Sequence, residues 1–134
     1  MNVHERLISL KACKEARGWA AQYQTAQEVW DNCTRIDWLF WWAAREGQLG
    51  SVVSAAKEIA QSVSHLKGTN AAYAAYAAAC AAAAAAAYAA AYAVVSAAYA
   101  AADAAGAAAD AAASAKQEQL NMQIARKHLH CPTW

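Results

Sequence analysis

The sequence lacks the residue patterns that would indicate enzymatic chemistry. Its five glycines are scattered, so they form neither a P-loop nor a dinucleotide-binding motif, and HExxH is absent. Carboxylates are few and occur singly, without the pairing that acid–base catalysis uses. We therefore predict no catalytic residues and no cofactor, and expect a protein that is not an enzyme.

The sequence also lacks closely paired cysteines and an excess of one charge, and we expect no secretory leader. No CxxC pair occurs, and the net charge is only +1, without a basic cluster. We expect reduced, mostly buried thiols, a cytoplasmic protein, and no direct contact with nucleic acid. The polar residues after Met1 differ from the start of a signal peptide. The widely separated cysteines are Cys13, Cys33, Cys80 and Cys131.

What the chain does contain is a nearly pure alanine run from Ala71 to Ser114. Alanine is the strongest helix former, so the run predicts helix. Larger residues recur three or four positions apart, which places them on one face of the helix. Their average spacing is close to that of an eleven-residue repeat, in which eleven residues make three helical turns. This series consists of Tyr73, Tyr76, Cys80, Ala84, Tyr88, Tyr92, Val95 and Tyr99.

The length of this run raises a question of scale. No glycine, proline or asparagine interrupts it between Ala71 and Ala105. One helix over these residues would span about 52 Å, whereas a compact domain of this size has a radius of gyration of about 14 Å. We therefore expect either an elongated domain or a helix that contacts another molecule. We do not expect membrane insertion, because alanine is weakly favoured in hydrocarbon and the tyrosines lie mid-run.

Shorter helices are predicted in the first half of the chain. The first covers residues 3–23, with an apolar stripe that includes Ile8. A capping box, Thr25-x-x-Glu28, begins the second, and a weaker cap at Thr34 precedes the Trp38–Trp42 segment. Ser51 would cap a helix ended by Gly68. The apolar seam of that helix consists of Val52, Ala56, Ile59, Val63 and Leu66.

Two further features lie near the end of the chain. Gly106 could permit a bend or a close helix crossing, and residues 116–130 form a last helix with Leu120, Ile124 and His128 on one side. His128, His130 and Cys131 are metal-ligating residue types, but the two histidines would face different sides of a helix, so we predict no metal. Together these elements predict an all-α fold.

We expect one domain, residues 1–134, in which short N-terminal helices pack as a bundle on one or two long alanine-rich helices. Residues 1–68 would form a tryptophan-rich half, and residues 69–134 the long Ala/Tyr helix and the C-terminal helix. Tryptophan is dense in the first half, where Trp38 and Trp42 share a helix face and Trp41 points elsewhere. Most of these rings should be core, and a partner-binding anchor is the alternative.

Several segments together carry a resemblance to a known family. These are Leu10-Lys-Ala-Cys13, Thr25-x-x-Glu28-x-Trp30, Asp37-Trp38-Leu39 and the Ala/Tyr/Asp repeat. In this order they resemble the putative immunity proteins of bacteria and phages, of the immunity-protein-5-like kind. The resemblance implies an all-α, non-enzymatic protein that binds and neutralises a toxin effector. A phage-encoded inhibitor of a host defence complex, of the anti-CRISPR type, fits the same features.

We therefore expect a protein partner, and self-association along the alanine face is compatible with it. Two other functions are weaker alternatives: a bundle that sequesters a nucleotide, which lacks lysine and arginine in the alanine run, and an ice-binding helix, which lacks regular threonine. The predicted partner-binding residues are Tyr73, Tyr76, Tyr88, Tyr92, Tyr99 and Trp41.

Overall fold

The computed structural model describes residues 1–89, 94–112 and 115–134, apart from the side chains of residues 69 and 87–89. Within these residues the regular elements are all helices, so the predicted all-α class is confirmed. The helices are α1 Val3–Ser9, α2 Lys14–Ala20, α3 Ala26–Asn32, α4 Ile36–Arg45, α5 Leu49–Ser62, α6 Thr69–Ala89, α7 Val94–Ala112 and α8 Ala115–His128.

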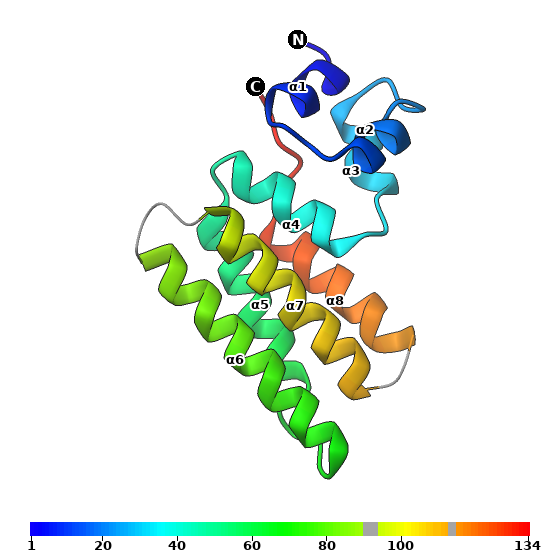
Figure 1. Cartoon of the computed structure of the whole chain (residues 1–134). Coiled ribbons are helices and arrows are strands. Elements are labelled where there is room, and N and C mark those ends of the chain that lie inside the picture. The colour runs from blue at the N-terminus through cyan, green and yellow to red at the C-terminus, as the bar shows by residue number, and fades with distance from the viewer. Residues whose placement is uncertain (90–93, 113–114) are drawn as a thin grey trace.

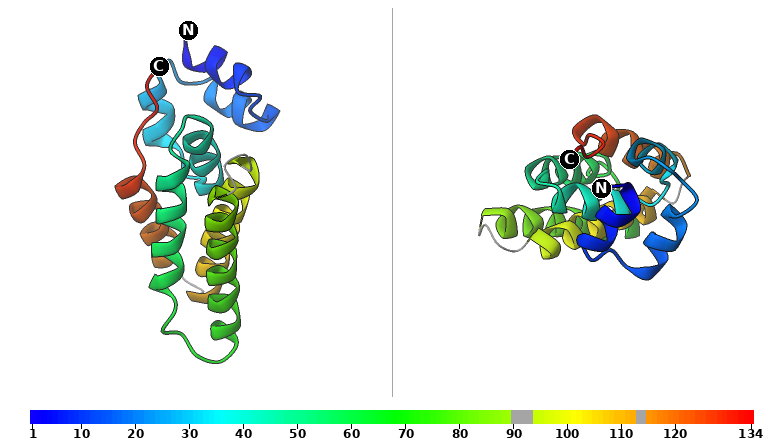
Figure 2. Two further views of the ribbon diagram at one scale, coloured as in Figure 1. Left: turned by 90° about the vertical axis from the view of Figure 1, so that its left-hand side faces the viewer. Right: turned by 90° about the horizontal axis from the view of Figure 1, so that it is seen from above.

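The four longest helices, α5 to α8, run lengthwise in an elongated bundle, and α1 to α3 gather at one end beside α4 (Figure 1, Figure 2). α7 occupies the centre, because it packs against α4, α5, α6 and α8. Its buried face consists only of alanines, whose small side chains allow neighbouring helices to approach closely. α4 and α5 therefore pack directly on the alanine-rich second half of the chain.

Of the one or two long alanine-rich helices expected, the structure has two, so a single helix from Ala71 to Ala105 is not formed. The run forms two helices, α6 and α7, which lie side by side and antiparallel (Figure 1). At 1.5 Å per residue, the 21 residues of α6 span about 31 Å. The physical reason is burial, because folding back removes alanines of both helices from water, among them Ala77 and Ala101. The connection at residues 90–93 lies outside the described residues.

The expected first helix over residues 3–23 is wrong. It is divided into α1 and α2 by a turn in which Lys11 adopts a positive φ of 62°. Cys13 then begins α2, where its Sγ accepts a hydrogen bond from the backbone N–H of Ala16 at 3.5 Å. Ile8, placed in the apolar stripe, is 46% exposed. The periodicity of apolar residues did not reveal the break between α1 and α2, because it contains no information about the Cys13 side-chain cap that stabilises the start of α2.

Helix ends were predicted with mixed success. The capping box at Thr25 is confirmed, because its side chain accepts from Glu28 N–H and the Glu28 carboxylate accepts from the N–H of Thr25. Gly68 has a positive φ of 74°, but it does not end the preceding helix as predicted, because α5 ends at Ser62 with Val63 as its C-cap. The caps at Thr34 and Ser51 are wrong: α4 follows Arg35, and α5 begins at Leu49 after Gln48, neither with a side-chain cap.

The α5 seam is confirmed, with Val52, Ile59 and Val63 fully buried. The stripe predicted for the last helix is correct only at Ile124, because Leu120 is exposed and two polar side chains are buried in its place. Asn121 donates to the carbonyl of Ala105 at 3.0 Å and accepts from Gln117 at 2.8 Å. These hydrogen bonds compensate the burial of the amides and hold α8 against α7.

α7 passes through Gly106 without meeting the close crossing that a glycine would permit. No heavy atom lies within 4 Å of the position that a Cβ would occupy there. The glycine is exposed on the outer face of α7, so the suggestion of close packing at this residue is wrong. An alanine would fit the same space.

Candidate binding site

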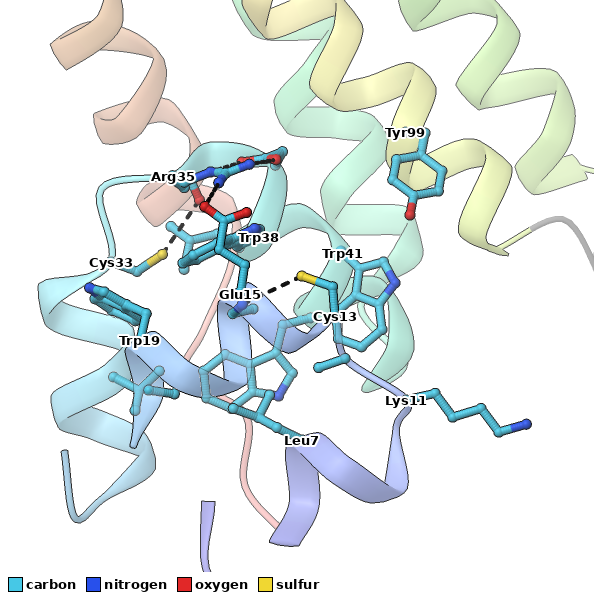
Figure 3. Close-up of a pocket in the computed structure, with 17 residues that line it drawn as sticks. Leu7, Lys11, Cys13, Glu15, Trp19, Cys33, Arg35, Trp38, Trp41 and Tyr99 are labelled. Atoms are coloured by element: carbon cyan, nitrogen blue, oxygen red, sulfur yellow. Dashed lines mark hydrogen bonds and ion pairs between the residues drawn. The ribbon is translucent and has the colours of Figure 1, made fainter. Parts of the chain in front are cut away.

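A cavity of about 290 Å³ opens between the N-terminal helices and α4, with Tyr99 of α7 at its edge (Figure 3). We call it the aromatic pocket, because five of its lining side chains are large aromatic residues. These are Trp19, Trp38, Trp41, Trp42 and Tyr99. The pocket therefore depends on α2, α4 and α7 together, which lie far apart in the sequence.

Helix α4 supplies three of the tryptophans, and they differ in burial. Trp42 is buried, with its ring centroid 5.7 Å from that of Trp30 and 6.5 Å from that of Trp134. Trp38 and Trp41 are partly buried and face the pocket. The expectation that most of these rings belong to the core holds for Trp42, while Trp38 and Trp41 pack against the edge of the core.

Helix α2 supplies the opposite wall. Trp19 packs at 5.7 Å from Trp38 and at 5.0 Å from Tyr23, both with tilted rings.

Arg126 of α8 donates to the carbonyls of Trp30 and Cys33, both at 2.9 Å. These bonds satisfy carbonyl groups at the end of α3 and fix that helix beneath the pocket.

Charge in the pocket centres on Arg35. Its guanidinium donates to both oxygens of Asp37, at 2.7 and 3.2 Å, and to Glu15 at 3.1 Å. It also lies 4.2 Å from the ring centroid of Trp38, in a cation–π arrangement. The hydrogen bonds to Asp37 raise the pKa of Arg35 above its ordinary value. Burial has the next largest effect on this pKa and opposes the increase. The cation is thus already paired with two carboxylates and an aromatic face.

The thiols only partly follow the prediction that most would be buried. Cys33 is buried in the wall of the pocket, and burial raises the pKa of its thiol. Cys13 is exposed, and Cys80 and Cys131 are partly buried, so the expectation is wrong for Cys13. All four are free cysteines.

The structure brings two of the predicted partner-binding residues to this pocket, Trp41 and Tyr99. Tyr73 and Tyr76 lie on α6, where they are 50% and 55% exposed, and Tyr99 is 59% exposed. Tyr92 and the side chain of Tyr88 lie outside the described residues. We use the name tyrosine face for Tyr73, Tyr76 and Tyr99.

Contacts between α6 and α7 connect the tyrosine face. The pKa of Tyr76 is raised, first by a hydrogen bond with Cys80 and also by the nearby charge of Asp103 on α7. Asp103 is four residues from Tyr99, one turn along the same side of α7. Asp103 therefore lies near tyrosines of both helices, Tyr76 of α6 and Tyr99 of α7.

Sequence reasoning missed four important pocket residues. The apolar stripe predicted for residues 3–23 includes Trp19 as a core residue, and the prediction for Trp38 is a packed helix face. Arg35 and Glu15 were not singled out, although they meet across 20 residues of chain. The Arg35-x-Asp37 spacing was the only local signal, because the contact with Glu15 depends on how α2 is placed against α4.

Ligand-type residues near the end of the chain are engaged elsewhere. His128 Nε2 lies 3.4 Å from a Glu58 carboxylate oxygen, and the backbone N–H of His130 donates to Gln48 at 2.9 Å. Across the described ranges, no group of three or more histidine, cysteine or acidic side chains could hold a metal ion.

No protein-family model, curated protein or solved structure matches this chain. The resemblance to immunity proteins therefore rests on the sequence segments alone and stays a prediction. In the described part of the chain, no helix combines the length and the apolar character needed to cross a membrane, α6 included.

Proposed function

We propose that this chain is a non-enzymatic inhibitor of the immunity type, which neutralises a toxin effector by binding it directly. The supporting observation is the tyrosine face, whose three side chains are each at least half exposed. Tyrosine offers a large, rigid contact area and a hydroxyl that can hydrogen-bond, and it is enriched among the residues that dominate binding energies.

Helix α6 strengthens this proposal because it carries no charged residue between Thr69 and Ala89. A partner can therefore cover Tyr73 and Tyr76 without removing a charge of α6 from water, which would be unfavourable, and Asp103 of α7 is the charge that borders the tyrosine face. Alanines between the tyrosines allow the backbone of a partner to come close. Trp41 lies beside Tyr99 at the mouth of the aromatic pocket (Figure 3) and extends the same surface.

Helix length does not by itself indicate an external partner for this protein. A single 52 Å helix would have needed an external partner, but α6 and α7 cover part of each other instead. The exposure of the tyrosines after this folding is what supports a binding surface. Had the hairpin enclosed them, the proposal would have lost its physical basis.

The proposal can be tested by placing a photo-crosslinking amino acid at position 76 in cells that contain the candidate toxin. The partner identified in this way is purified, and its affinity is measured by calorimetry. Combined replacement Tyr73→Ala, Tyr76→Ala and Tyr99→Ala should weaken binding by at least about 30-fold, since hot-spot residues contribute 2 kcal/mol or more. Protection of growth against the toxin should be lost with it.

Leu120→Ala is the matched control, because Leu120 is an exposed apolar residue on α8, away from the tyrosine face. Unchanged affinity in the folded triple variant would refute the proposed surface. Capture of a subunit of a host defence complex, with inhibition of that complex, would replace the immunity role by the alternative, a phage-encoded anti-defence inhibitor.

A further inference from the structure

The aromatic pocket is small enough to restrict what it can hold. Its volume of about 290 Å³ lies at the lower limit of small-molecule sites, which range from roughly 300 to 1,000 Å³. A ring system of the size of indole fits this space. The first constraint on a ligand is therefore size.

The walls favour a flat, aromatic occupant. Trp19 and Trp38 stand 5.7 Å apart with planes inclined by 53°, and Trp41 and Tyr99 border the opening (Figure 3). Aromatic rings attract one another best in such tilted or offset arrangements, at centroid separations of about 4.5–7 Å. A ligand ring that packs beside this pair, at the opening bordered by Trp41 and Tyr99, would extend an arrangement that the protein already uses.

The charged side chains decide against an ionic ligand. An anion would meet Glu15 and Asp37, while Arg35 is already bound to both of them. A cation would be repelled by Arg35 and Arg45, which already lie 4.2 and 5.9 Å from the ring centres of Trp38 and Trp41. Lys11 extends away from the cavity (Figure 3). The pocket lining thus contains two basic side chains, Lys11 and Arg35, and two acidic ones, Glu15 and Asp37.

From size, wall geometry and charge, we infer that the aromatic pocket binds one uncharged aromatic ring, of the size of indole. This inference rests on the cavity and does not depend on the proposed inhibitor function. The same chemistry is offered by a free aromatic metabolite and by a tryptophan side chain of a peptide. Both sources are therefore included in the test.

The full-length protein is titrated against 5-fluoroindole, and binding is followed by ¹⁹F NMR. N-acetyltryptophanamide, which is neutral and carries a peptide-like backbone, is used as competitor. Benzyltrimethylammonium and indole-3-acetate provide a cationic and an anionic comparison. We expect saturable binding of the neutral ring and at least about tenfold weaker binding of both ions, a difference of about 1.4 kcal/mol.

Two pocket variants and one control locate the site. Trp41→Ala and Tyr99→Ala should each weaken 5-fluoroindole binding about tenfold. Tyr73→Ala removes a similarly exposed tyrosine that does not line the pocket, and should change binding less than about twofold. Circular dichroism verifies the helical fold of each variant. Tyr99 is so exposed that its variant remains informative if Trp41→Ala unfolds.

The competitor distinguishes the two sources. Displacement by N-acetyltryptophanamide would assign the pocket to a protruding side chain of a protein, and its failure to displace would assign it to a free aromatic compound. Both results support the inference. Absence of saturable binding, tighter binding of either ion, or unchanged binding in the folded Tyr99→Ala variant would overturn it.

Discussion

At the scale of single residues, Arg6 and Glu46 form the most shielded ion pair among the described side chains. The Glu46 side chain is 6% exposed and accepts two hydrogen bonds from the Arg6 guanidinium, at 2.7 and 2.8 Å. These bonds lower the pKa of Glu46, against the opposing effect of burial. The pair joins α1 to the end of α4, next to the aromatic pocket.

Replacing Glu46 by Gln should lower the free energy of unfolding at pH 7 by about 1.5–3 kcal/mol, as expected when a hydrogen bond between charged groups is lost. Because the folded pKa of Glu46 is lowered, its stabilising contribution is complete above the unfolded value of about 4.3. The contribution is lost as the pH falls through the folded pKa. Urea unfolding at pH 7 and at pH 3 measures the difference between wild type and variant.

Glu15→Gln is the control for this measurement. The Glu15 side chain is 72% exposed, and its ion pair with Arg35 lies in solvent, so the expected change is below about 1 kcal/mol. A gap between wild type and Glu46→Gln that stays constant from pH 7 to pH 3 would contradict the electrostatic explanation.

At the scale of elements, the hairpin of α6 and α7 replaces the long rod that the composition suggests. Its contact surfaces consist of alanine, which contributes little apolar area per residue but packs at close range. Ala77 and Ala84 of α6 are fully buried, as are Ala101 and Ala104 of α7. The hairpin should therefore be sensitive to side-chain size at the buried positions and tolerant at the exposed ones.

Ala77→Leu tests this size limit. The larger side chain must push α6 away from its neighbours, and we expect a loss of about 1–3 kcal/mol in unfolding free energy. Thermal unfolding followed by circular dichroism should show a lowered Tm. Ala78→Leu makes the same change at the next residue, which is exposed, and should stay within about 0.5 kcal/mol of wild type. Equal effects of the two substitutions would disprove close alanine packing.

At the scale of the whole molecule, the two ends of the chain lie close together at the end of the bundle that holds α1 to α3 (Figure 1, Figure 2). The Trp134 indole N–H donates to the carbonyl of Met1 at 3.0 Å, and Arg6 lies 5.6 Å from its ring centre. Gln48 holds the preceding segment through two hydrogen bonds with the backbone of His130, at 2.8 and 2.9 Å. The C-terminal segment thus braces the helices that form one wall of the pocket.

Trp134→Ala should loosen this brace without unfolding the bundle. The lost hydrogen bond and cation–π contact together amount to about 1–2 kcal/mol. Hydrogen exchange of the α1 amides should accelerate by roughly 5- to 30-fold, while the amides of α5 and α7 should change little. Trp134→Phe keeps an aromatic ring and loses only the hydrogen bond, so its effect should be smaller. Equal acceleration throughout the chain would show that Trp134 supports global stability instead.

Local sequence signals correctly predicted the structural features that depend on residues close together in the chain. The helical class follows from alanine propensity, the start of α3 from the Thr25–Glu28 capping box, and the buried seam of α5 from its spacing. The same signals failed where a competing contact decided the outcome. Periodicity merged α1 and α2 because it carries no information about the turn at Lys11, and it placed Leu120 inside although Asn121 has the buried hydrogen bonds.

The candidate site could be predicted only in part. Tyr99 and Trp41 stood out as large aromatic residues, and the structure places both at the pocket. The roles of Arg35 and Glu15 could not be foreseen, because their pairing requires α2 to lie against the start of α4. Partners separated by 20 residues leave no periodic trace in the sequence.

Composition and spacing alone determined that this chain is helical, that the run from Ala71 to Ser114 is built mainly from alanine and tyrosine, and that charge is nearly absent from that run. Tertiary structure decided that the alanine run folds back on itself, and which tyrosines stay in water. Helix propensity is a property of single residues and their near neighbours, and it does not limit how far a helix continues. The folding back is decided by the apolar surface that two helices bury together, which only the packed molecule defines.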